Sequence, residues 1–91
     1  MNNVRRKALR KVLDSISDVR FMLDEELKSA LEELRDEEQE ALDNMPENLE
    51  GTERYESIET ALELLESAYE NLDNAVCTLE EAEDNIEEAI A

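Results

Sequence analysis

A strict seven-residue repeat runs through the second half of the chain and constrains the fold more than any other feature. One column of the repeat consists of Ile58, Leu65, Leu72, Leu79 and Ile86. A second consists of Ala61, Ala68, Ala75, Ala82 and Ala89, and a third of Leu62, Tyr69, Val76, Glu83 and Ile90. Apolar residues three and four positions apart share one helix face, and a sustained repeat of seven predicts a left-handed supercoil. We therefore expect a helix from about residue 53 to 90, with a partner helix packed closely along the alanines.

The first half of the chain predicts another long helix, from about residue 4 to 43. Leu9, Ile16, Leu23 and Ala30 recur at intervals of seven, as do Leu13, Leu27 and Leu34, with Arg20 between them. The segment 44–52 contains the only proline, Pro46, and the only glycine, Gly51. Proline ends a helix, glycine accepts a positive φ, and Thr52 is suited to cap the next helix. Because so short a connection makes helices antiparallel neighbours, we predict an all-α single domain folded as a long helical hairpin.

The apolar stripes are wider than one helix pair can cover. Leu62, Tyr69 and Val76 would remain partly exposed in a monomer, together with Leu13, Leu27 and Leu34. Contiguous exposed apolar patches indicate association. We favour a homodimer that forms a four-helix bundle, and the alternative is docking of a different protein on the same face. The residues predicted to form this packing and oligomer face are Leu62, Leu65, Tyr69, Leu72, Val76, Leu79, Ala61, Ala68, Ala75 and Ala82.

Negative charge dominates the chain, with 27 acids, nine bases and a net charge of −18. Residues 1–13 contain five of the bases and no acid. In an antiparallel pair we expect this basic segment to neutralise the acidic end of the second helix, at Glu80, Glu81, Asp84, Glu87 and Glu88. A field of this size repels nucleic acid and anionic lipid and attracts basic surfaces. The charge therefore predicts a basic protein partner, without direct nucleic-acid or membrane binding.

The residue types that most enzymes need are missing. The chain has no histidine, which removes the commonest general base and metal ligand. Neither a Ser–His triad nor a Glu-x-x-His di-iron pair can therefore be assembled. Cys77, the only cysteine, has acidic neighbours that disfavour its thiolate. We expect a non-enzymatic protein with no catalytic residue, cofactor or metal site. The alternative is binding of Ca²⁺ or Mg²⁺ by clustered carboxylates. Such binding would be weak, because no segment has EF-hand spacing.

No apolar run is long enough for a signal peptide or a membrane span. The basic N-terminal segment has the composition of a membrane-surface helix, but the other residues, with 27 acids and four bases, oppose an anionic surface. The expected location is cytoplasmic.

Two neighbouring columns of acids follow the outer face of the second helix. They form a ridge about 45 Å long, from a rise of 1.5 Å per residue. One interpretation is mimicry, in which a line of negative charge occupies the groove of a nucleic-acid-binding protein. The other is a solvated outer face that keeps a helical protein soluble. The members of this acidic ridge are Glu56, Glu59, Glu63, Glu66, Glu70, Asp73, Glu80, Asp84 and Glu87.

The turn and its flanks also carry a resemblance. Residues 37–40 read EEQE, residues 44–49 read NMPENL and residues 51–56 read GTERYE. Over these segments the chain resembles a group of short acidic helical proteins from phages and mobile elements of Gram-positive gut bacteria. The resemblance implies a helical hairpin, a mobile-element origin and a bacterial host, and it implies no activity.

These observations favour a protein-interaction module that binds a host or phage protein through its acidic helical surface. Small acidic phage proteins often block a host protein, as anti-restriction and anti-CRISPR inhibitors do, which is an analogy of class. The sharper hypothesis is a DNA mimic that inhibits a nucleic-acid-binding defence protein. The alternative is a structural or accessory helical bundle whose acidic face is merely solvated.

Overall fold

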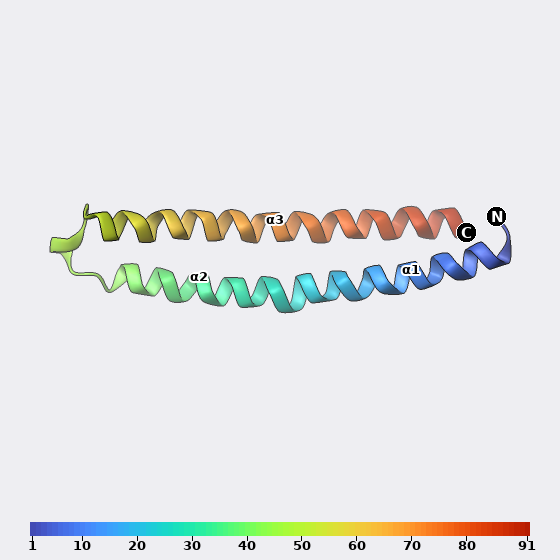
Figure 1. Ribbon diagram of the computed structural model, residues 1–91, viewed down its shortest axis with the longest axis horizontal. Coiled ribbons are helices and arrows are strands. Elements are labelled where there is room, and N and C mark those ends of the chain that lie inside the picture. Colours follow the sequence, from blue (N-terminus) through green and yellow to red (C-terminus); the bar gives the residue numbers. More distant parts are fainter.

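The computed structural model describes all 91 residues, which form two long antiparallel helical arms (Figure 1). In the first arm, α1 (Asn3–Phe21), a π-helical turn (Met22–Leu27) and α2 (Lys28–Asp43) follow one another without a break. The second arm is α3 (Glu53–Ile90), and the two chain ends lie together at one end of the hairpin. The molecule measures 70 × 16 × 14 Å. The predicted all-α antiparallel hairpin is confirmed.

Residues between the arms reverse the chain by local chemistry. Pro46 precedes a single 3₁₀ turn, Glu47–Leu49, and Gly51 has a φ of +78°, which glycine adopts without steric cost. The Thr52 hydroxyl accepts a hydrogen bond from the Tyr55 N–H at 3.3 Å and donates one to the Leu49 carbonyl at 2.6 Å. The positive φ at Gly51 and the capping role of Thr52 are therefore as predicted.

The arms meet along one thin seam that encloses almost no core. Val76 is the only buried residue, 5 % exposed, and the side chains around it are half-buried. The expectation that Val76 would be partly exposed in a monomer is wrong, because its column faces the first arm as fully as the Leu65 column does. Leu62 and Tyr69 of the same column are half-buried.

The alanine column of α3 follows one edge of this seam. Ala61, Ala68, Ala75 and Ala82 are half-buried, whereas Ala89 is exposed. At about 100° per residue the alanines lie to one side of the Leu65 column, and the Leu62 column lies to the other. The closest packing is therefore at Val76, away from the alanines, and that edge of the seam stays shallow.

The π-helical turn changes which side chains of the first arm face α3. Its closing hydrogen bond runs from the Lys28 N–H to the Leu23 carbonyl, five residues back, so the turn holds one residue more than an α-helical turn. The interval between inward-facing residues is therefore eight at this point instead of seven. One half-buried row reads Leu13, Arg20, Lys28, Arg35 and Leu42, and the other reads Leu9, Ile16, Leu23, Leu31, Glu38 and Met45.

The columns predicted for the first arm face α3 only up to residue 23, beyond which the inward rows shift by one residue. Leu27 and Leu34, expected to be partly exposed in a monomer, are 45 % and 57 % exposed, whereas the exposure of Ala30 departs from the prediction. The shift brings Leu31 and Leu42 to the seam in place of the smaller Ala30 and Ala41. Burial of the larger side chains stabilises the hairpin in proportion to their apolar area, which offsets the exposure of Leu27 and Leu34.

Deletion of Glu26, an exposed residue of the π-helical turn, tests this register shift. An α-helical turn would replace the π-helical turn, and Lys28, Leu31 and Arg35 would still face α3. We expect the midpoint of thermal unfolding, followed by far-UV circular dichroism, to stay at or above that of the wild type.

The control is deletion of Glu33, an exposed residue within regular α-helix. Every later residue of α2 would rotate by about 100°, which turns Leu42 and Met45 away from the seam. We expect the free energy of unfolding to fall by about 2–4 kcal/mol. Equal destabilisation by the two deletions would contradict a register shift located at the π-helical turn.

Candidate functional site

The acidic ridge extends along α3 with all nine side chains exposed, but its carboxylates fall into two groups. Glu66, Asp73 and Glu80 pair with bases of the first arm. The other six make no ion pair within 4.0 Å, and they are Glu56, Glu59, Glu63, Glu70, Asp84 and Glu87. One third of the ridge thus contributes to the hairpin itself, and two thirds faces solvent without a partner.

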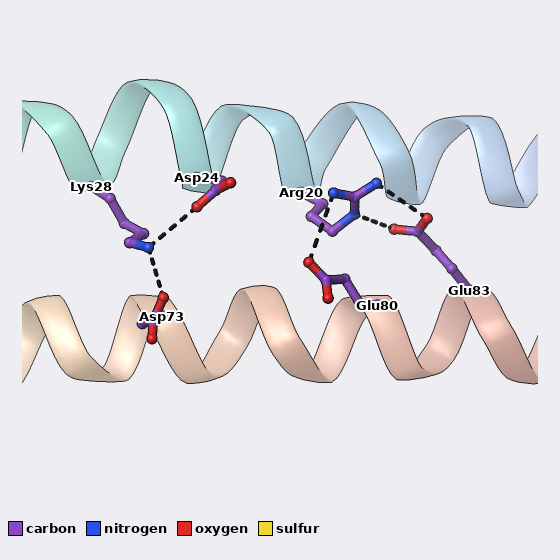
Figure 2. A network of polar contacts seen from close by, with 6 residues as sticks. All are labelled: Arg20, Asp24, Lys28, Asp73, Glu80 and Glu83. Atoms are coloured by element: carbon purple, nitrogen blue, oxygen red, sulfur yellow. Dashed lines mark hydrogen bonds and ion pairs between the residues drawn. The ribbon is translucent and has the colours of Figure 1, made fainter.

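Arg20 makes the tightest contact between the arms (Figure 2). Its Nε lies 2.6 Å from Glu83 Oε1, and its Nη2 lies 3.4 Å from Glu83 Oε2. A third nitrogen, Nη1, lies 3.9 Å from Glu80. The hydrogen bond to Glu83 raises the pKa of Arg20 above its ordinary value. A two-nitrogen contact of arginine with carboxylate constrains orientation as well as distance, so this pair fixes the register of the arms.

Arg20 and Glu83 are the polar residues that interrupt two otherwise apolar columns of the sequence. Arg20 follows Leu13 at an interval of seven, and Glu83 follows Val76 at the same interval. The structure places the two interruptions opposite each other. Each exception is visible in the sequence, but their pairing is not, because the only signal for it is the opposite charge of the two residues.

Lys28 makes a second bridge across the seam, also drawn in Figure 2. Its Nζ lies 2.7 Å from Asp73 Oδ1 on α3 and 3.2 Å from Asp24 Oδ1 on the first arm. The side chain is only 12 % exposed. The hydrogen bond to Asp73 raises the pKa of Lys28 above its ordinary value of 10.5. Lys28 therefore keeps its charge throughout the neutral and mildly alkaline pH range.

Tyr69 lies between Lys28 and the third bridging base, Arg35. Lys28 Nζ is 5.2 Å from the centre of the Tyr69 ring, and Arg35 Cζ is 5.9 Å from it. Both distances fall within the range of cation–π attraction. Arg35 also lies 3.7 Å from Glu66 and 3.2 Å from Asp36. The aromatic ring and the carboxylates together explain why two cations occupy a seam that the sequence predicted to be apolar.

The two flanks of the hairpin consequently differ. On α3, Glu66 and Asp73 lie on the same side of the Leu65 column as Tyr69, and the alanine column lies on the opposite side. We call the side of the bridging bases Arg20, Lys28 and Arg35 the closed flank. The side of the alanines is the open flank, where Val12, Ile16, Val19 and Leu79 line a groove of about 350 Å³ with Lys11 and Ser15.

The basic N-terminal segment lies beside the acidic end of α3, as expected, with Arg10 lining one hollow together with Glu83 and Glu87, but it forms no ion pair there. Among its five bases only Arg6 donates a hydrogen bond to α3, with Nε 3.3 Å from the Ile90 carbonyl. No base of the segment lies within 4.0 Å of an acid. The register of the arms places residues 5–7 opposite the last residues of α3. Arg6 then supplies positive charge at a helix C-terminus, where the helix dipole favours it.

The remaining surface carries no cluster of metal ligands. No three His, Cys, Asp or Glu side chains converge closely enough to hold a metal ion, and Cys77 is a free, exposed thiol. None of the helices combines the length and apolar character needed to cross a membrane. No protein-family model, curated protein or solved structure matches the chain. A proposal about function therefore depends on the hairpin's two flanks and its carboxylates.

Charge reversal at Lys28 tests the bridge to Asp73. Lys28→Glu places like charges together at the seam, and we expect the midpoint of thermal unfolding to fall. Adding Asp73→Lys restores an opposite pair and should recover part of the loss, which a double-mutant cycle measures. Additive effects of the two substitutions would show that the bridge contributes nothing to stability.

The raised pKa of Lys28 also predicts a pH dependence. A base whose pKa is higher in the folded state contributes stability that is fully present below its unfolded pKa and is lost as pH rises through the folded value. We expect the stability difference between wild type and Lys28→Gln to be constant from neutral pH up to the ordinary pKa of 10.5, and to shrink above it. Thermal unfolding of both proteins across this range gives the difference, and a decline that begins near neutral pH would contradict the assignment.

Proposed function

We propose that this protein is a non-enzymatic interaction module whose acidic surface binds a basic protein at the place where that protein holds nucleic acid. The observation that carries the proposal is the number of free carboxylates. Six of the 27 acids form ion pairs, so 21 have no base within 4.0 Å. A rigid surface with this excess of unpaired charge is suited to a partner that brings its own bases.

The density of charge along the rod supports the same proposal. Residues 24–70, which form the half of the hairpin nearest the turn, contain 18 acids and three bases. That half of a 70 Å rod therefore carries about one net negative charge per 2–3 Å of its axis, against roughly one per 1.7 Å for duplex DNA. A basic groove that binds a polyphosphate backbone would meet a comparable field on this part of the hairpin.

The resemblance of the turn to phage and mobile-element proteins supports a sharper form of the proposal. A protein of that origin would act in the cytoplasm of a bacterial host, on a nucleic-acid-binding defence protein. The part of the acidic ridge best suited to contact is its six unpaired members, because they are exposed and contribute no ion pair to the hairpin.

The working unit in this proposal is a homodimer that forms a four-helix bundle. The hairpin alone buries only Val76 and leaves Val19, Leu27 and Leu34 about half exposed. A second hairpin would cover apolar surface of this kind, as in other bundles built from paired helices. Association along the open flank would leave the six unpaired ridge residues on the outside, available to a different partner.

A structural or accessory bundle is the second candidate. The observation in its favour is that Glu66, Asp73 and Glu80 pair within the hairpin, so part of the acidic ridge serves the fold. In this case the remaining carboxylates keep the assembly soluble and have no partner of their own.

Neutralisation of the six unpaired ridge residues separates the two candidates. The variant combines Glu56→Gln, Glu59→Gln, Glu63→Gln, Glu70→Gln, Asp84→Asn and Glu87→Gln. Tagged wild type should retain a basic nucleic-acid-binding protein from bacterial lysate, and both high salt and duplex DNA should release it. At about 0.5 kcal/mol per exposed charge pair, the variant should bind that protein roughly a hundredfold more weakly.

A matched control changes six exposed acids elsewhere, and they are Glu32, Glu33, Glu37, Glu40, Glu47 and Glu50, each to Gln. It has the same net charge, and because these acids lie on the first arm and the turn and not on the ridge of α3, it should lose clearly less affinity than the ridge variant. Equal loss in both variants would mean that only total charge matters and would overturn the role of the ridge. Capture by neither wild type nor variants would favour the structural candidate.

A further inference from the structure

The open flank carries an apolar stripe that no part of the chain covers. Val12 and Val19 line the groove above Ile16 and Leu79, and they are 45 % and 52 % exposed. These side chains form the wall of the seam on the side without bridging bases. Apolar surface that is continuous along a helix, and not scattered, indicates an interface.

The stripe continues past the π-helical turn. Val12, Val19, Leu27 and Leu34 follow one another at intervals of seven, eight and seven, and the interval of eight lies at the turn. The extra residue that moves Lys28 and Arg35 to the seam thus keeps Leu27 and Leu34 in line with the valines. At 1.5 Å per residue the stripe is about 33 Å long.

We infer that the open flank binds a second copy of this chain, with the two hairpins pointing in opposite directions. The inference rests on the proposed dimer and specifies its contact face and its orientation. In this arrangement a two-fold axis crosses the middle of the rod, so the stripe of one copy meets the stripe of the other. Val12 of one copy then lies near Leu34 of the second, because both are equally far from residue 23.

The exposed area of the hairpin supports a second copy as the occupant. Its accessible surface is 6762 Å², whereas a compact monomer of 10.5 kDa exposes about 5,400 Å² by the usual scaling with mass. The excess is about 1,300 Å², and a stable interface of standard size buries roughly 800 Å² of each partner. One interface along a 33 Å stripe and the alanine column beside it is therefore enough to remove most of the excess.

Charge decides the orientation. Residues 24–70 contain 18 acids and three bases, whereas residues 1–23 and 71–91 together contain nine acids and six bases. Copies that point the same way would place the two strongly acidic halves together. Helices in contact are about 8–10 Å apart, close to the roughly 8 Å screening length of physiological salt, so this repulsion is weakened but not removed. Opposite directions place each acidic half against the nearly neutral half, which carries the basic segment of residues 1–13.

The first test compares two charge insertions on the same helix. Val19→Glu places a carboxylate in the stripe, and Phe21→Glu places one on an apolar residue that is 60 % exposed and lies about 200° away around the helix. Sedimentation equilibrium should give a dimer for wild type and Phe21→Glu, with a dissociation constant at least about tenfold higher for Val19→Glu. A monomeric wild type, or a dimer that only Phe21→Glu weakens, would overturn the inference.

The second test measures orientation in a protein with an unaltered stripe. A spin label at Glu40→Cys, with Cys77→Ser to remove the native thiol, lies on the exposed face of α2, 17 residues from residue 23. Opposed hairpins should give a label separation of about 50 Å along the rod by pulsed dipolar spectroscopy. A separation below about 30 Å would place both ends together and overturn the opposed arrangement.

The inferred dimer and the proposed acidic contact can be contradicted independently of each other. Val19→Glu alters no carboxylate of the acidic ridge, so lysate capture of the basic protein by this variant reports on the ridge alone. Capture without any dimer would overturn the second-copy inference and leave the proposed acidic contact standing. A dimer of opposed hairpins that captures nothing would support the inference and count against the basic partner.

Discussion

One additional residue in the π-helical turn decides which side chains the two arms share. Without it, Leu27 and Leu34 would follow Leu13 in the inward row of the first arm. With it, Lys28 and Arg35 take those places and meet Asp73, Glu66 and the ring of Tyr69. The bridging bases, the position of the exposed leucines and the difference between the two flanks all depend on this offset.

Different interactions consequently stabilise the two sides of the hairpin. On the closed flank, bases that reach across the seam satisfy acids of α3, most tightly at Arg20 and Glu83. On the open flank, Val12, Val19 and their neighbours line an apolar groove. Exposed ion pairs contribute little stability individually, so they specify the register of a hairpin whose single buried residue, Val76, provides little core. Stability of the arms must then come mainly from the half-buried apolar rows.

The difference between the two flanks also determines where the unpaired negative charge lies. The bridging bases neutralise only acids close to the seam, and the basic segment of residues 1–13 stays at the other end of the rod from the turn. Most of the negative field is therefore left on the outer surface and near the turn. In the proposed opposed dimer, apolar contact and acidic contact use different flanks, so self-association would not compete with binding of a basic partner.

The helical hairpin, the end of each arm and the apolar columns of α3 could be predicted from the sequence, but not which of these columns packs most closely on the first arm. These follow from local chemistry, namely the heptad repeat, the proline and glycine of the turn, and the Thr52 cap. The sequence also located the acidic ridge, since any residue at those positions of α3 lies away from the apolar columns. Only the tertiary structure decided the register of α2, the pairing of Arg20 with Glu83 and the two roles of the ridge acids. A π-helical turn leaves no distinct pattern in residues 22–27, and its place depends on which rows of the first arm fit α3 best. The same holds for Lys28 and Arg35, whose inward direction is favourable only because Asp73, Glu66 and Tyr69 lie opposite.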